Sequence, residues 1–306
     1  MDKELGLKRR KFVKGITLAG IGSLFTGAIS AREITKPKLK RILRIAHFTD
    51  VHLSADNNAP HRFNACLKDI ERHQVDFFLN GGDSIMAADY DSITRQQVID
   101  MWDLWKDSLD KFQEVKMYSC LGNHDMWWAA PNKNDPMYGK QFAMDQLNMP
   151  SPYYSFEKAG WHFIVLDSNN DGGGALGQEQ LQWLTDDLAG LALETPVLVM
   201  SHYPILSAST HTVGGNHKDA LPITKLFYLH RDKNIHCISG HVHLLDRATY
   251  NKVQYYCNGS VSGFWWGEGD EQSAEKYWYQ ETPPGYAILD LFEDGSLQNS
   301  YCLYDH

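Results

Sequence analysis

Residues 42–52 read ILRIAHFTDVH, an apolar run followed at once by two potential metal-binding side chains, Asp50 and His52. The run is short and rich in β-branched and aromatic residues, which predicts a buried β-strand that ends just before Asp50. In open α/β sheets, ligand sites gather beyond the carboxyl ends of the strands. The segment therefore predicts a strand together with the beginning of a metal site.

The same arrangement recurs at four further places along the chain. Apolar runs at 75–80, 115–121, 197–200 and 235–239 also predict short buried strands. Because five strand ends can deliver their side chains to one crevice, we expect the polar blocks that follow them to converge in space. These blocks are Gly82-Asp83, Gly122-Asn123-His124-Asp125, Ser201-His202 and Gly240-His241-Val242-His243.

The donor types indicate the class of metal. Imidazole and carboxylate groups occur in these blocks without cysteine, which suits manganese, iron, zinc or cobalt better than calcium, magnesium or a soft metal. Seven candidate ligands are too many for one ion, but they divide into two sets of four if one carboxylate bridges, and Asp83 is central in the chain order. Two ions about 3.5–4 Å apart can hold the attacking and the leaving oxygen of an in-line displacement. Phosphate ester hydrolysis is the reaction that uses this arrangement most.

Each residue also has a purely structural interpretation when it is taken alone. Asp83 after two glycines, and Asn123, are typical of turns, because their side chains accept local backbone hydrogen bonds. His202 could simply end a strand, and His211 and His217 compete with it for a ligand role. We favour His202 because it directly follows an apolar run, whereas the other two histidines follow none.

The five blocks, in this order, resemble the motif of the calcineurin-like metallophosphoesterase family: Asp-x-His, Gly-Asp, Gly-Asn-His-Asp/Glu, His and Gly-His-x-His. The resemblance spans residues 42 to 260 and implies two metal ions bridged by Asp83. It assigns Asp50, His52, Asp83 and His243 to one ion, and Asp83, Asn123, His202 and His241 to the other.

The resemblance also implies a mechanism. His124 corresponds to the family's non-ligand histidine, which protonates the leaving alkoxide, while Asp125 orients its ring. The nucleophile is a metal-bridging hydroxide, because two cations lower the pKa of bound water. The expected cofactors are two divalent or mixed-valence ions of manganese, iron, zinc or cobalt. The expected activity is phosphoester hydrolysis, above all of phosphodiesters; a broad phosphomonoesterase and a non-catalytic scaffold are the alternatives.

Details of the motif bear on the branch of the family. The opening and closing blocks together resemble the branch that includes bacterial cyclic-nucleotide phosphodiesterases. Purple acid phosphatases place a tyrosine ligand shortly after the Gly-Asp block, but residues 82–86 read GDSIM, which disfavours a ferric-tyrosinate site. Trp127 and Trp128 follow the catalytic block directly. Either at least one indole borders the cleft and stacks on the substrate, or both pack against the loop beneath them.

Helical periodicity lies between the predicted strands. Apolar residues recur on one helical face at 63–70, 98–109 and 178–188. Strands that alternate with such helices indicate an α/β layered fold. The resemblance sharpens this to two packed mixed β-sheets flanked by helices, in αββα layers, with residues 42–306 as one domain.

The amino terminus predicts export. Residues 8–14, KRRKFVK, precede a mostly apolar stretch and then small residues at 28–31, which fits a signal peptide over 1–30 and a basic linker over 31–41. The paired arginines and Phe12 resemble a bacterial twin-arginine signal. We therefore expect the twin-arginine export machinery as a partner, a periplasmic or extracellular location, and no stable membrane span in the mature chain. A retained membrane anchor is the alternative.

Net charge narrows the choice of substrate. The chain carries −9, and the first 30 residues contain six Lys or Arg against two acidic residues, so the remainder carries about −13. A polyanion would be repelled over most of this surface, which disfavours a nucleic acid and favours a small phosphate ester. The sequence leaves the oligomeric state open.

Overall fold

All five predicted strands form, with at most two residues between the end of each strand and the start of its polar block. They are β1 (Arg41–Phe48), β2 (Phe77–Asn80), β3 (Met117–Ser119), β6 (Pro196–Met200) and β7 (Asn234–Ser239). The computed structural model describes residues 39–55, 58–86, 92–262 and 282–305. The predicted signal peptide and most of the predicted linker lie outside the described residues.

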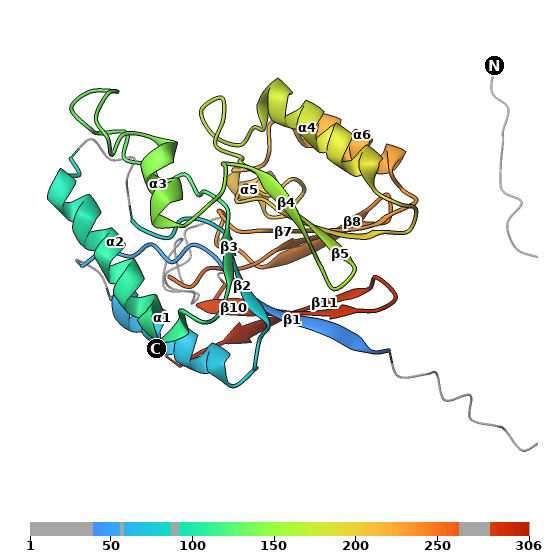
Figure 1. Ribbon diagram of the computed structural model, residues 1–306, viewed down its shortest axis with the longest axis horizontal. Coiled ribbons are helices and arrows are strands. Elements are labelled where there is room, and N and C mark those ends of the chain that lie inside the picture. Colours follow the sequence, from blue (N-terminus) through green and yellow to red (C-terminus); the bar gives the residue numbers. More distant parts are fainter. Residues whose placement is uncertain (1–38, 56–57, 87–91, 263–281, 306) are drawn as a thin grey trace, which may run out of the picture. The chain divides into compact units, whose positions relative to one another are not determined.

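The strands belong to two mixed sheets (Figure 1). The first has the order β11-β10-β1-β2-β3, with β10 (Gly285–Phe292) and β11 (Leu297–Leu303) added from the end of the chain. In it, β1, β2 and β3 run parallel, while β10 is antiparallel to both of its neighbours. The carboxyl ends of the three parallel strands therefore meet at one edge, where their polar blocks begin.

The second sheet has the order β4-β5-β6-β7-β9-β8. Its remaining strands are β4 (Tyr154–Lys158), β5 (Trp161–Val165), β8 (Asp246–Tyr250) and β9 (Val253–Cys257). The inner strands β5, β6, β7 and β9 are parallel, and the two edge strands are antiparallel to their neighbours. The blocks after β6 and β7 consequently leave the sheet side by side.

Three large apolar cores hold the layers together, and a small fourth cluster contains Val242, Leu244 and Cys257. The core between the sheets combines Ile45 and Phe77 from the first sheet with Trp161 and Leu198 from the second. Alternation along β1 sends Ile45 into this core and the next residue, Ala46, into the core beneath the helices. The result is the expected αββα arrangement of two mixed sheets flanked by helices.

The helices cover the outer faces of the sheets (Figure 1). The first sheet is covered by α1 (Ala59–Glu71) and α2 (Arg95–Leu109), and the second by α4 (Gly177–Gly190) and α6 (Ala220–Leu229). The predicted apolar faces are the buried ones; Leu184 and Leu188 of α4, for example, are fully buried. Shorter elements are η1 (Asp110–Phe112), α3 (Lys140–Gln146) and α5 (Thr210–Val213).

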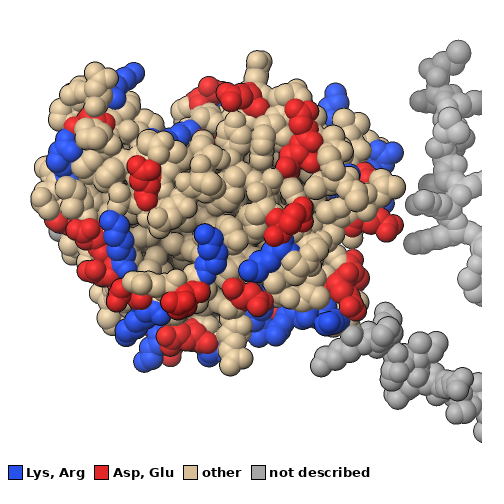
Figure 2. Space-filling model, viewed as in Figure 1, with Lys and Arg blue, Asp and Glu red and all other residues tan. Residues whose placement is uncertain are grey.

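The described surface carries charges of both signs. Figure 2 shows acidic and basic side chains interspersed on the viewed face. A bilayer-crossing helix needs about 20 mostly apolar residues. Within the described ranges, none of the helices has the length and hydrophobicity to cross a membrane.

Candidate metal centre

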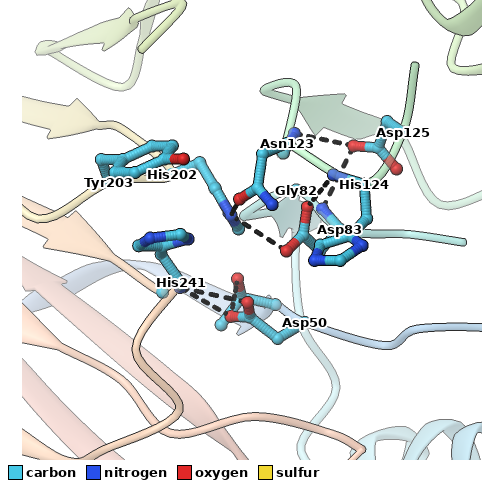
Figure 3. Close-up of polar contacts among 12 residues, drawn as sticks. Asp50, Gly82, Asp83, Asn123, His124, Asp125, His202, Tyr203 and His241 are labelled. Carbon is cyan, nitrogen blue, oxygen red and sulfur yellow. Dashed lines mark hydrogen bonds and ion pairs between the residues drawn. The ribbon is translucent and has the colours of Figure 1, made fainter. Parts of the chain in front are cut away.

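The polar blocks of both sheets converge on one cleft, as the strand order predicts. Asp50 and His52 follow β1, Asp83 follows β2 and Asn123 follows β3. From the second sheet, His202 follows β6, and His241 and His243 follow β7. Figure 3 shows the labelled side chains of this set directed toward one another. The chain thus brings all seven candidate ligands together.

The backbone is unusual at five of these positions. A non-glycine residue with positive φ is uncommon and costs about 1–3 kcal/mol in backbone strain, so a cluster of such residues points to a functional site. The left-handed residues, with φ between 50° and 70°, are Asp50, His52, Asp83, His241 and His243. Four of these residues, all but Asp50, line the cleft. Sequence reasoning did not predict this conformation.

One donor group combines Asp50, His52 and His243, whose donor atoms all lie within 4.8 Å of one another. His52 Nε2 is 3.0 Å from His243 Nε2, and His243 Nε2 is 3.3 Å from Asp50 Oδ1. Burial alone would raise the pKa of Asp50, but His243 and His202 outweigh it and lower the pKa. Two imidazole nitrogens facing one ionised carboxylate form a donor set that fits a transition-metal cation.

A second donor group combines Asp83, His202 and His241, and a third combines Asp83 with His52 and His124. His202 Nε2 is 3.1 Å from Asp83 Oδ2 and 3.2 Å from Asn123 Oδ1, while its Nδ1 lies 2.8 Å from the carbonyl oxygen of Gly81. When Nδ1 carries the proton and donates it to that carbonyl, Nε2 presents a lone pair to two acceptor oxygens. Three lone pairs that face one another in this way repel each other unless a cation lies between them. A ligating histidine usually donates its other ring N–H to a backbone carbonyl, as His202 does in this tautomer.

The pKa of His202 points the same way. Burial disfavours the charged ring, but the carboxylates of Asp83 and Asp50 outweigh burial and raise the pKa to about 9. Burial likewise acts to raise the pKa of Asp83, yet His202 and His124 hold that pKa well below its usual range. The pocket therefore favours a positive charge at this position, whether a proton or a metal ion supplies it.

Asp83, a member of the second group, also lies close to the first. Its Oδ2 is 3.7 Å from His52 Nε2 of one group and 3.1 Å from His202 Nε2 of the other. The preceding residue, Gly82, has φ +92°, and a Cβ there would lie 2.5 Å from the backbone nitrogen of Gly122. Only glycine allows the loops after β2 and β3 to approach so closely. This explains why the block reads Gly-Asp.

His124 and Asp125 point in different directions. The His124 ring is mostly buried, faces His52 edge-on with 4.9 Å between ring centroids, and lines the cleft. Asp125, which we expected to orient that ring, is hydrogen-bonded to backbone amides in the structure. Its carboxylate instead accepts backbone N–H bonds from Asp83 (3.1 Å), Ser84 (2.8 Å), Ile85 (3.4 Å) and Gly122 (2.7 Å).

The physical reason is that this buried carboxylate satisfies the amides of two loops. Burial, followed by the charge of Asp83, raises the pKa of Asp125 to about 7. Asp125 therefore ties the loop after β2 to the loop after β3.

The cleft itself has a volume of about 180 Å³. Beyond His52, Asp83, His124, His241 and His243, its lining consists of Val213, Gly214, Gly215 and Val242. Sequence reasoning missed this apolar wall, although the adjacent glycines in the loop after α5 were a signal that the backbone comes close to another element.

The other aromatic and histidine candidates lie away from the cleft. Trp127 is buried and its Nε1 donates to Ile93 O at 3.0 Å, so it packs against the loop beneath it. Trp128 is 40% exposed and packs edge-on against Tyr138 at 5.2 Å between ring centroids. His211 is exposed. His217 is buried, and its Nε2 lies 3.2 Å from Ser201 Oγ, so this contact links the loop of His217 to the end of β6.

Comparison with known proteins identifies related sequences. Residues 43–245 match the sequence profile of the calcineurin-like phosphoesterase family. The chain is 26% identical over 271 residues to a 3',5'-cyclic-nucleotide phosphodiesterase from Nostoc sp., covering 83% of this chain and 90% of that protein. It is 29% identical over 167 residues to purple acid phosphatase 15 from Arabidopsis thaliana, covering 51% of this chain and 29% of that enzyme's length.

Solved structures share the fold. A dimetal phosphatase from Danio rerio superposes with a TM-score of 0.59 at 15% identity, covering 87% of this chain and 100% of the other. A purple acid phosphatase from yellow lupin, Lupinus luteus, superposes with a TM-score of 0.56 at 16% identity, covering 86% and 52%.

Proposed function

The chain belongs to the calcineurin-like phosphoesterase family, and we propose that it is a dinuclear metal-dependent hydrolase with a preference for phosphodiesters. The observation that carries the proposal is the pair of donor groups Asp50–His52–His243 and Asp83–His202–His241, which lie beside one cleft. Asp83 Oδ2 of the second group is 3.7 Å from His52 Nε2 of the first. Asp50, His52, Asp83 and His243 would hold one ion, and Asp83, Asn123, His202 and His241 the other. When bound, two cations supply an acidified water as nucleophile and neutralise the charge that develops on the phosphoryl oxygens.

His124 supplies the proton for the leaving oxygen in this proposal. Its ring borders the cleft beside both donor groups, while its backbone N–H donates to Asp83 Oδ1 at 2.8 Å. The main chain therefore places the imidazole next to the proposed bridging carboxylate. A general acid in this position lowers the barrier most for poor leaving groups.

The apolar wall supports a diester. Val213, Gly214, Gly215 and Val242 border the same cleft as the charged donors. A diester has a second ester arm that can lie against such a wall, whereas a monoester dianion carries an additional charge there. The cyclic-nucleotide phosphodiesterase from Nostoc sp. among the relatives points to the same substrate class.

A broad phosphomonoesterase is the second candidate, favoured by the similarity to purple acid phosphatase 15. A scaffold without turnover receives less support, because the chain keeps every candidate ligand together with His124.

The test compares bis-p-nitrophenyl phosphate with p-nitrophenyl phosphate. The protein is stripped with chelator and reloaded separately with manganese, iron, zinc and cobalt. We expect metal to restore activity, with the higher kcat/KM on the diester. Asp83→Asn should remove this activity, and His211→Ala, at an exposed histidine outside the cleft, is the matched control. Preference for the monoester would support the phosphatase, and a metal-loaded protein that cleaves neither compound would support the scaffold.

A further inference from the structure

Tyr203 packs directly on one of the candidate ligands. Its ring centroid is 3.7 Å from that of His241, with 33° between the ring planes. The same ring meets His202 edge-on, with 5.6 Å between centroids and 83° between planes. Figure 3 shows the three side chains together, with Tyr203 beside both histidines of one donor group. No motif drew attention to this tyrosine in the sequence.

A glycine loop holds the Tyr203 ring from another side. A Cβ at Gly173 would lie 2.6 Å from Tyr203 Oη, and a Cβ at Gly174 would lie 3.3 Å from Tyr203 Cδ1. The backbone N–H of Tyr203 donates to Ser168 Oγ at 3.2 Å. These contacts leave the ring little freedom to rotate, because close-packed neighbours restrict side-chain rotamers. They also place the Tyr203 hydroxyl next to Gly173.

The loop that lines the cleft approaches His241 as well. Gly215 has φ +79°, and a Cβ there would lie 2.9 Å from His241 Cδ2 and 3.0 Å from His241 Nε2. This loop is tied to the glycine loop, because the Lys218 backbone N–H donates to Gly174 O and Lys218 Nζ donates to Asp171 O at 2.7 Å. The two loops therefore form one packed unit around the stacked rings.

The two histidines of this donor group are held by different means. His202 is oriented by the hydrogen bond between its Nδ1 and Gly81 O. The backbone of His241 is anchored, since its N–H lies 3.0 Å from Asp50 Oδ2, but the ring lies against Tyr203 and Gly215. An imidazole ligand needs a fixed ring orientation to aim its lone pair. Within the described part of the chain, Tyr203 and Gly215 pack against the His241 ring, whereas a hydrogen bond to Gly81 orients the His202 ring.

We propose that Tyr203 is a positioning residue that orients the His241 ring toward the Asp83 donor group, and that it acts through its ring and not through its hydroxyl. The inference rests on the proposed function, because it assumes that His241 binds metal. It assigns Tyr203 no contact with the substrate. The proposed role also differs from that of a tyrosine ligand, because the Tyr203 hydroxyl lies beside Gly173.

The test is a titration of the metal-depleted full chain with Co²⁺, followed by absorption spectroscopy and by metal analysis of the bound stoichiometry. Tyr203→Phe keeps the ring and should bind two ions as the wild type does. Tyr203→Leu removes the stack, and we expect the affinity for one ion to fall about 10- to 100-fold, the usual effect of losing a group that orients a ligand. The visible band of that ion should change as well.

A matched control and a second variant keep the test decisive. Tyr153→Leu removes a tyrosine that packs on Trp183, away from the site, with 5.0 Å between ring centroids, and should leave both affinities unchanged. Gly215→Ala disturbs the His241 ring independently and should reproduce the loss, which decides the matter if Tyr203→Leu does not fold.

Three results would overturn the inference. Wild-type affinities in both Tyr203→Leu and Gly215→Ala would show that His241 needs no packing support. A defect in Tyr203→Phe equal to that in Tyr203→Leu would show that the hydroxyl matters. A phenolate-to-iron charge-transfer band in the Fe³⁺-loaded wild type would make Tyr203 a ligand. A wild type that binds no Co²⁺ would refute the proposed function itself.

Discussion

At the scale of single residues, neighbours in the chain take opposite roles in the site. His124 faces the cleft, whereas Asp125 turns inward and accepts four backbone N–H bonds. The turn after β3 has to satisfy buried amides of the loop after β2, and an ionisable side chain in a buried position is stabilised only if it is hydrogen-bonded. The block Gly-Asn-His-Asp therefore combines one proposed proton donor with one structural carboxylate.

Replacing His124 by Ala should separate catalysis from metal binding. We expect metal content to survive, because the backbone N–H that donates to Asp83 Oδ1 is retained in the variant. Turnover should fall by about 10²- to 10⁴-fold for a diester with an alkyl leaving group, and less for a p-nitrophenyl ester, which leaves without protonation. Metal analysis together with kcat for both esters checks this. Loss of bound metal from the variant would mean that His124 is itself a ligand.

At the scale of elements, a buried histidine joins the second sheet to the helix that covers it. His162 of β5 contacts Glu157 of β4 through Nδ1, and its Nε2 lies 2.7 Å from Asp187 Oδ2 of α4. Burial lowers the pKa of His162, but the hydrogen bonds to Asp187 and Glu157 outweigh burial, and the net shift is upward. His162 therefore links three elements, β4, β5 and α4.

This pKa shift predicts how stability depends on pH. A raised pKa in the folded state means that the stabilisation is fully present below the unfolded value of about 6.5 and is lost as the pH rises through the folded value. Urea denaturation of the wild type across pH 6 to 9 should show this decline in the unfolding free energy, and His162→Gln should flatten it. Equal slopes for the two proteins would show that His162 is not protonated in the folded state.

At the scale of the whole molecule, the site joins the two sheets. The first sheet supplies Asp50, His52, Asp83 and Asn123, and the second supplies His202, His241 and His243. Both proposed ions would take ligands from both sheets. Bound metal should therefore stabilise the packing of one sheet on the other, in addition to the apolar core between them.

Metal removal should lower the melting temperature without unfolding the protein. Binding to the folded state alone stabilises it by about 2.7 kcal/mol when free metal is at 100 times its Kd. We expect chelator to lower Tm while the far-UV circular dichroism at 25 °C is kept, because the three apolar cores contain no metal ligand. Re-addition of metal should restore Tm, whereas Asp83→Asn should be insensitive to chelator. If chelator leaves the Tm of the wild type unchanged, the protein holds no metal ion that takes ligands from both sheets.

The sequence by itself determined the five motif strands, the α/β class and the set of residues that meet in the cleft. These features are local: an apolar run specifies a strand, and the residue that follows it leaves from the strand's carboxyl end. The family resemblance added the two-sheet layering, which periodicity does not specify.

Only the tertiary structure decided how β10 pairs between β11 and β1, where Asp125 points, and which residues surround His241. Each of these depends on contacts between segments far apart in the chain. Tyr203 meets Gly173 and His241 because three loops fold onto one another, and Trp127 is buried because a core was available beneath it. Packing of this kind is collective, so no single stretch of sequence encodes it.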